Sequence, residues 1–262
     1  MKGSAALLQI RGLSRRFGGL QAVADLSFDA HEGEILGVIG PNGAGKSTTF
    51  NMIAGALAPS AGTIHFDGES LAGLPTHAFA ARGIMRTFQH NKPFPSMTLL
   101  ENVAVGRHTR IGTTLWQVIG ASPSARLAEQ RCREHAAEMI NFVGLGDWLE
   151  ADVSTLSFGQ GRLLEIARAL AGSPRLMLFD EPAAGLSPAE CERLIEVIRA
   201  IASRNISVLL IEHDMRFLMS LADRVVVLNF GRRIAEGTPD QIRSDPAVVE
   251  AYLGDLGALT RA

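Results

Sequence analysis

The segment GPNGAGKS, residues 40–47, has the composition and spacing of a loop that holds phosphate groups. Glycines let the backbone turn so that several N–H groups point inward, and the start of a following helix adds partial positive charge. Lys46 can reach the β- and γ-phosphates of a nucleotide, and Ser47 can bind Mg²⁺. The residues expected to bind phosphate are Gly40, Pro41, Asn42, Gly43, Ala44, Gly45, Lys46, Ser47 and Thr48. The loop indicates only a ligand class, because kinases, GTPases and transport ATPases all use it.

Two carboxylates, Asp180 and Glu181, follow directly after the apolar run LMLF. Such a run is typical of a buried strand, and a strand end in an open α/β sheet faces the ligand crevice. Asp180 is therefore a candidate to hold Mg²⁺, directly or through water. Glu181 points elsewhere along the pleat and is a candidate general base for an attacking water. No side-chain nucleophile is required, because phosphoryl transfer depends mainly on positioning and charge neutralisation.

The pattern of apolar residues predicts the elements that position these groups. The strand-like segment EILGVIG leads into the loop, and Phe50, Ile53, Ala54 and Leu57 then follow the spacing of one helix face. Strand patterns return at RLMLF, SVLLI and RVVVLNF, with a helical pattern between the first two. Strands that alternate with helices predict an α/β fold with a mostly parallel sheet.

Other segments differ from this pattern. Short strands and glycine turns precede the phosphate loop, and Asp67-Gly68 marks a later turn. Asp245-Pro246 predicts the start of a helix near the end of the chain. The sequence thus predicts a single domain, residues 1–262, with a core (1–90 and 156–230), a helical subdomain (91–155) and a C-terminal tail (231–262).

Composition excludes several classes of protein. The chain has 262 residues and a formal net charge of −2, and its Lys and Arg residues are scattered, which argues against a nucleic-acid partner. Its two cysteines, Cys132 and Cys191, form no CxxC motif and are expected to be reduced thiols. No apolar run approaches the ~20 residues that a membrane helix needs. We therefore expect a soluble protein that can still dock on a membrane protein.

The segment LSFGQ, residues 156–160, lies at a predicted helix start just upstream of LMLFDEP. It resembles the signature of ABC-type ATPases, usually LSGGQ. The segments RRFGGLQAV and RTFQH before it and AAGLSP and LLIEHD after it stand in the order of that family, so the resemblance covers essentially the whole chain. The resemblance implies a P-loop NTPase fold with a RecA-like, mostly parallel sheet and an N-terminal antiparallel β portion, and it implies binding of ATP and Mg²⁺. The further site residues that it implies are Phe17 on adenine, Gln89 near Mg²⁺ or water, His213 on the γ-phosphate, and Ser157, Gly159 and Gln160 acting on the ATP of a second subunit.

The chain departs from the family pattern at several positions. Phe158 replaces a glycine of the signature, and Gly161 stands where the family often has a polar residue. Phe17 replaces the commoner tyrosine, which keeps the ring and removes the hydroxyl. Ser187 replaces an aspartate of the D-loop, AAGLSP, and together with Glu190 it fits a helix capping box. None of these changes removes an expected ligand of Mg²⁺ or of the γ-phosphate.

The resemblance also implies partners. In the family, ATP lies between the phosphate loop of one subunit and the signature of the other, and this chain carries one copy of each motif. We therefore expect a homodimer or a heterodimer with a paralogous ATPase subunit. No membrane span is fused to the cassette, so the chain resembles a separate, cytoplasmic ATPase subunit on the inner face of the cell membrane. Its further partners would be membrane permease subunits and, indirectly, a periplasmic solute-binding protein.

The segments RTFQ, EPAAGL and AYLG resemble the ATPase subunits of bacterial branched-chain (hydrophobic) amino acid importers. In the family a groove beside the Q-loop receives a permease helix, here expected at residues 89–97. Alternatives remain open: urea or amide uptake, lipopolysaccharide export, a regulatory ATPase that moves no solute, and a small-molecule P-loop kinase. The signature and His213 argue against the kinase. The sequence does not name the solute, which contacts the permease and binding protein.

Overall fold

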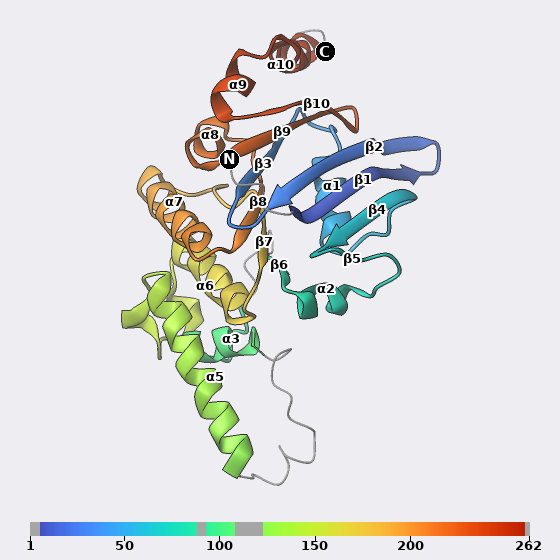
Figure 1. The fold of residues 1–262 in the computed structure, drawn as a ribbon. Helices are drawn as coiled ribbons and strands as arrows, with labels where there is room; N and C mark the ends of the chain where they lie inside the picture. The colour runs from blue at the N-terminus through green and yellow to red at the C-terminus, as the bar shows by residue number, and fades with distance from the viewer. Residues whose placement is uncertain (1–5, 88–92, 108–122, 260–262) are drawn as a thin grey trace.

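Two β-sheets share a hydrophobic core with helix α1 (Lys46–Ile53) (Figure 1). The structure is a computed structural model that describes residues 6–87, 93–107 and 123–259. In the larger sheet, strands β9, β3, β8, β7 and β6 run parallel, and β10 is antiparallel to β9. This arrangement confirms the mostly parallel sheet predicted from the sequence. In sheet order the strands are β10 (Arg232–Gly237), β9 (Arg224–Asn229), β3 (Ile35–Ile39), β8 (Ser207–Ile211), β7 (Leu176–Asp180) and β6 (Ile84–Arg86).

The parallel strands bring distant chain segments to one edge of this sheet. Their carboxyl ends lie together because neighbouring parallel strands run in the same direction. The phosphate loop follows β3, Asp180 ends β7, and His213 comes shortly after β8. The register pairs Asp180 with Ile211 and places β6 beside β7, so Arg86 ends at the same edge.

The smaller sheet is antiparallel and has the strand order β2-β1-β4-β5. It confirms the antiparallel β portion predicted near the N-terminus. Asp67 and Gly68 form the predicted turn between the last two strands, with φ angles of 53° and 78°. The strands are β1 (Ala6–Phe17), β2 (Leu20–His31), β4 (Ala61–Phe66) and β5 (Glu69–Ser70).

The parallel strands are buried on both faces. On β7, Leu176 and Leu178 face the core shared with α1 and the smaller sheet, whereas Met177 and Phe179 face the core on the other side. This alternation follows from the two-residue period of a strand, and it explains why the strand sequences are apolar throughout. The helices that cover the second face include α6 (Phe158–Ala171), α7 (Pro188–Ser203) and α8 (Met215–Leu221).

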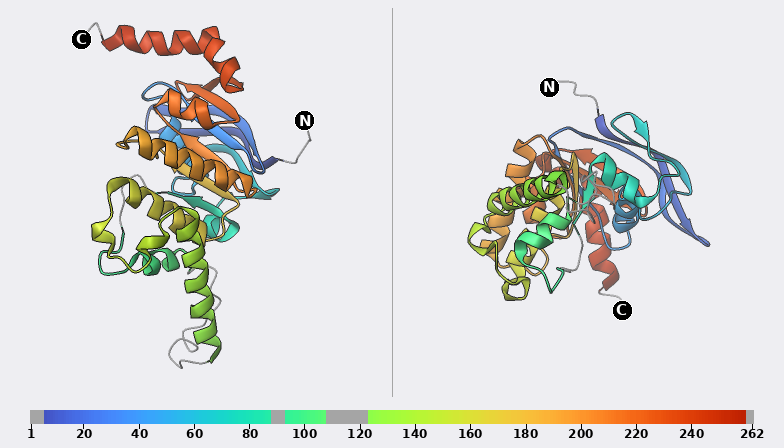
Figure 2. Two further views of the ribbon diagram at one scale, coloured as in Figure 1. Left: turned by 90° about the vertical axis from the view of Figure 1, so that its left-hand side faces the viewer. Right: turned by 90° about the horizontal axis from the view of Figure 1, so that it is seen from below.

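A group of helices packs below the sheets, and α5 extends away from them (Figure 2). Thr98 begins α3 with a capping box, since its hydroxyl accepts from the N–H of Glu101 and the Glu101 carboxylate accepts from its N–H. Both α3 and α5 pack on α6. The predicted boundaries at residues 90 and 155 stay a prediction. The elements here are α3 (Leu99–Val105), α5 (Pro123–Phe142), and the 3₁₀ turns Gly146–Trp148 and Val153–Thr155.

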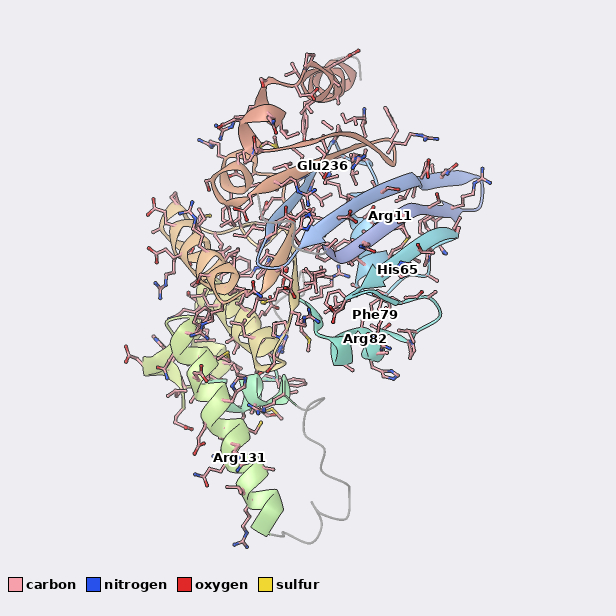
Figure 3. All side chains as sticks on the ribbon, viewed as in Figure 1. Arg11, His65, Phe79, Arg82, Arg131 and Glu236 are labelled. Carbon is pink, nitrogen blue, oxygen red and sulfur yellow. The ribbon has the colours of Figure 1, made fainter. Side chains whose placement is uncertain are left out.

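The C-terminal segment contains α9 (Pro239–Ser244) and α10 (Pro246–Leu259), while α2 (Thr76–Arg82) precedes β6. The carboxylate of Asp245 accepts a hydrogen bond from the N–H of Ala247 at 2.8 Å, as the Asp-Pro pair predicts. Among the described helices, none combines the length and the apolar composition that a membrane span requires. Figure 3 labels Arg11 on β1, Arg131 on α5 and Glu236 on β10.

Candidate nucleotide-binding site

The phosphate loop turns between β3 and α1 at three glycines with positive φ: Gly40 (154°), Gly43 (77°) and Gly45 (95°). A Cβ atom on Gly40 would lie 2.1 Å from the carbonyl oxygen of Leu228, so no other residue fits there. Lys46 is 6% exposed, and its ammonium group donates hydrogen bonds to the carbonyl oxygens of Gly40 (2.7 Å) and Pro41 (2.9 Å). The loop's own backbone therefore holds the cation where phosphate is expected.

Two glycines of this loop provide a matched test of its geometry. A Cβ on Gly45 would lie 2.5 Å from the carbonyl oxygen of Ala22, whereas a Cβ on Gly43 would meet nothing within 4 Å. Gly43→Ala is expected to lower the free energy of unfolding by about 1–2 kcal/mol through backbone strain. Gly45→Ala adds overlap and is expected to cost about 2–5 kcal/mol. Denaturant unfolding without nucleotide measures both, and equal losses would contradict the close backbone approach at Gly45.

Asp180 is buried at the end of β7, with its side chain 2% exposed. One carboxylate oxygen, Oδ2, accepts a hydrogen bond from Arg86 at 2.9 Å, and Oδ1 has no hydrogen-bond partner among the described residues. Burial raises the pKa of Asp180, and the charge of Arg86 opposes that effect. A buried carboxylate oxygen without a partner is a suitable oxygen ligand for Mg²⁺ or for one of its waters. The residues present therefore fit the predicted metal.

Glu181 and His213 meet at the carboxyl ends of the neighbouring strands β7 and β8. Oε1 of Glu181 lies 2.6 Å from Nε2 of His213. Glu181 adopts a left-handed backbone conformation with φ of 50°, and its N–H donates to the carbonyl oxygen of Ile211. A non-glycine residue in this conformation is uncommon and often marks a functional site. The backbone turn directs Glu181 away from Asp180 and toward His213.

Glu212, which the sequence did not identify as a site residue, is 4% exposed and connects the loops that follow β7 and β8. Its carboxylate accepts hydrogen bonds from the backbone N–H groups of Ala183 (2.8 Å) and His213 (3.1 Å). It therefore fastens the segment after Glu181 to the segment that carries His213. Burial raises the pKa of Glu212, and these N–H groups oppose the shift. The sequence indicates this role of Glu212 only weakly, because a single acidic residue after an apolar strand is usually solvated.

One cavity contains several of the predicted site residues. Phe17, at the end of β1, lines it together with His213 and residues 42–48 of the phosphate loop. Phe17 is 45% exposed, which leaves its ring available for stacking, and the guanidinium carbon of Arg15 lies 4.8 Å from the ring centroid. Sites more than 160 residues apart in the sequence thus meet around one open cavity.

The signature residues Ser157, Gly159 and Gln160 line a different cavity. Ser157 begins α6 with a capping box: its hydroxyl accepts from the N–H of Gln160, and the Gln160 side chain accepts from the N–H of Ser157. The S-x-x-Q spacing is the sequence signal of this box. One chain therefore does not bring its signature and its phosphate loop to the same cavity.

The D-loop lies beside the start of α6. Ser187 begins α7 with the predicted capping box, in which Glu190 accepts from the N–H and hydroxyl of Ser187, each at 2.8 Å. A Cβ on Gly159 would lie 2.2 Å from Oε1 of Glu190, so this glycine permits close contact between the two helix starts. Phe158 is 52% exposed and leans toward Gly185 of the D-loop. Gln89 lies outside the described residues, as do the neighbouring residues 88–92.

Comparison with known proteins agrees with this geometry. The family model described as "ABC transporter" matches residues 23–184, and a model described as "Branched-chain amino acid ATP-binding cassette transporter" matches residues 232–256. A high-affinity branched-chain amino acid transport ATP-binding protein of Pseudomonas aeruginosa is 43% identical over 96% of this chain and 99% of its own length. The corresponding Escherichia coli K12 protein is 42% identical over the same shares of the two chains.

A more distant relative and a solved structure extend the comparison. The lipopolysaccharide export system ATP-binding protein of Haemophilus influenzae is 33% identical over 95% of this chain and 98% of its own. A crystal structure of an ATP-binding cassette of an ABC transporter in its ADP conformation superimposes with a TM-score of 0.82, at 29% identity, over 96% of this chain and all of the other. The chain belongs to the ABC transporter family and is one of its ATP-hydrolysing, ATP-binding cassettes.

Proposed function

We propose that this chain is the ATPase subunit of a bacterial ABC importer for branched-chain or other hydrophobic amino acids. The observation that carries the proposal is the full-length identity of 43% to a branched-chain amino acid transport ATP-binding protein, joined by the tail match at residues 232–256. The lipopolysaccharide export relative is 33% identical, so export is less well supported. The match at residues 232–256 matters because these residues lie outside the segments assigned to ATP.

ATP binds in the cavity between β1 and the phosphate loop. Phe17 stacks on the adenine ring, because an exposed aromatic face is the part of this cavity suited to a base. Residues 40–48 surround the phosphates with backbone N–H groups and the start of α1. Lys46 exchanges its two carbonyl acceptors for phosphate oxygens, which bind a buried ammonium more strongly because they are charged.

Hydrolysis uses the pair of Glu181 and His213. A water attacks the γ-phosphorus, a new O–P bond forms, and the bond to the β-phosphate oxygen breaks to release ADP. Glu181 takes the proton of that water, while His213 orients Glu181 and contacts the γ-phosphate. Bound Mg²⁺ would neutralise phosphate charge, held by Ser47, Gln89 and Asp180. The free Oδ1 of Asp180 supports that last assignment.

The active assembly is a dimer in which each ATP lies between two cassettes. Ser157, Gly159 and Gln160 act on the ATP held by the partner, and the start of α6 supplies N–H groups for its γ-phosphate. The location of these residues in a cavity separate from the phosphate loop supports this arrangement. ATP then holds the two surfaces together, and loss of the γ-phosphate releases them.

A groove beside the helical part is proposed to receive a permease helix. Its volume is about 440 Å³, and side chains from β6, α3 and α6 form it. An apolar groove of this kind suits one face of an amphipathic helix. Docking there would place the chain on the cytoplasmic face of the cell membrane. The lining residues are Met85, Arg86, Thr87, Phe94, Val105, Gly106, Glu165, Arg168 and Ala169.

Reconstitution tests the proposed function. The cassette is combined with the permease subunits encoded beside it, a paralogous ATPase subunit if one is present, and the solute-binding protein, in vesicles that contain ATP. We expect uptake of labelled leucine, isoleucine or valine that stops when Lys46 is changed to alanine. Failure to co-purify with any permease would favour a regulatory ATPase, and uptake of urea or an amide alone would replace the solute class.

A further inference from the structure

Arg86 is a half-buried cation with two hydrogen-bond acceptors at the end of β6. Its guanidinium donates one hydrogen bond to Oδ2 of Asp180 (2.9 Å) and another to Oδ1 of Asn51 on α1 (2.6 Å). Its central carbon lies 4.9 Å from the centroid of the Phe50 ring. A planar guanidinium held by two acceptors and an aromatic face has little freedom to rotate. Arg86 therefore has a fixed position between α1 and β7.

This position determines how Asp180 is oriented. Because Oδ2 is bound to Arg86, the carboxylate plane is fixed and Oδ1 is the oxygen left for another ligand. The Asp180 side chain is 2% exposed, so no bulk water replaces Arg86 as the partner of Oδ2. Loss of a partner that orients a metal-binding side chain from outside typically lowers metal affinity by about tenfold to a hundredfold.

The same arginine borders the proposed permease groove. Met85, Arg86 and Thr87 all line that groove, and 24% of the Arg86 side chain is exposed. The N–H of Thr87 donates to the carbonyl oxygen of Leu178 at 3.0 Å, which ties the groove wall to β7 two residues before Asp180. One side chain thus contacts the groove and the carboxylate.

We propose that Arg86 is a positioning residue that holds Asp180 in the orientation needed for the metal of Mg·ATP. The inference rests on the proposed function, because that function assigns Asp180 to the metal. Arg86 does not contact substrate in this role. Its effect passes through the carboxylate, and its place on the groove wall makes it a link between the groove and the metal site.

Metal binding to the isolated cassette tests the role without measuring turnover. Mn²⁺ is titrated in the presence of a non-hydrolysable ATP analogue, and free Mn²⁺ is followed by its electron paramagnetic resonance signal. Arg86→Met is expected to weaken Mn²⁺ binding by about tenfold to a hundredfold, the usual effect of losing an outer partner. Arg86→Lys, which keeps the charge and one donor, should recover part of the loss. Binding of labelled ATP in EDTA should stay at the parent value.

Two controls separate the possible failures. Arg82→Met removes a cation from the neighbouring α2, where Arg82 pairs with the exposed Glu69, and should leave Mn²⁺ binding unchanged (Figure 3). Asp180→Asn tests the metal assignment itself. If Asp180→Asn weakens Mn²⁺ binding while Arg86→Met and Arg86→Lys do not, the positioning role is wrong and the metal assignment stands. If Asp180→Asn has no effect, the proposed role of Asp180 fails first, and the inference fails with it. If Arg86→Met does not fold, Arg86→Lys is measured alone. Weaker Mn²⁺ binding than in the parent then supports the positioning role, and unchanged binding contradicts it.

Discussion

Changing Glu181 to glutamine is expected to lower the ATP turnover rate by about a hundredfold to ten-thousandfold, the range that a positioned general base contributes. The amide has nearly the shape of the carboxylate but cannot take the proton of the attacking water. ATP affinity should change little, because Glu181 is assigned to the water and not to the phosphates. Single-turnover hydrolysis and a titration with labelled ATP measure the two quantities separately.

Glu192→Gln provides the matched control for this substitution. Glu192 lies on the exposed face of α7, and its replacement makes the same change in charge and shape away from the site. The control should keep the parent turnover rate. Equal turnover in Glu181→Gln and the parent would remove Glu181 from the role of general base, and His213 would then need separate examination as the group nearest to it.

Lys46→Ala is expected to weaken ATP binding by roughly tenfold to a hundredfold, which corresponds to losing charged hydrogen bonds worth about 1.5–3 kcal/mol. The ammonium is buried at the loop and donates to two backbone carbonyls, so the substitution also leaves those acceptors unpaired. The measurement is a fluorescence titration with labelled ATP in the presence of Mg²⁺.

Arg131→Ala removes a cation from the exposed face of α5, far along that helix from the sheets, and serves as the control (Figure 3). It should bind ATP like the parent. Circular dichroism of Lys46→Ala without nucleotide shows whether the loop change has unfolded the chain. An unchanged ATP titration in a folded Lys46→Ala protein would contradict the assignment of residues 40–48 to the phosphates.

Much of the fold could be predicted because its signals are local. The apolar run before Asp180 forms β7, the glycine loop follows β3, and the Asp67-Gly68 turn joins β4 to β5. Ser187 begins α7 as its spacing to Glu190 predicts. Each of these features depends on a few consecutive residues, whose backbone preferences and side-chain hydrogen bonds act over one turn.

The contacts of the site were less predictable because they depend on strand order and register. No local sequence pattern predicts that Arg86 binds Asp180, because the pair forms only when β6 lies beside β7. Glu212 likewise receives its role from Ala183, on the loop after the neighbouring strand. The separation of the signature from the phosphate loop follows from packing of α6 on the other face of the sheet. Such long-range pairings are not encoded in any one segment.

We propose that ATP is held between two cassettes, each of which supplies a different surface. Light scattering of Glu181→Gln at saturating ATP and Mg²⁺ detects such a dimer, with the chain alone and with its paralogous subunit. We expect a nucleotide-dependent species of about twice the 28.0 kDa mass of one chain, absent with ADP. Monomers alone in every mixture, with ATP demonstrably bound, would contradict it.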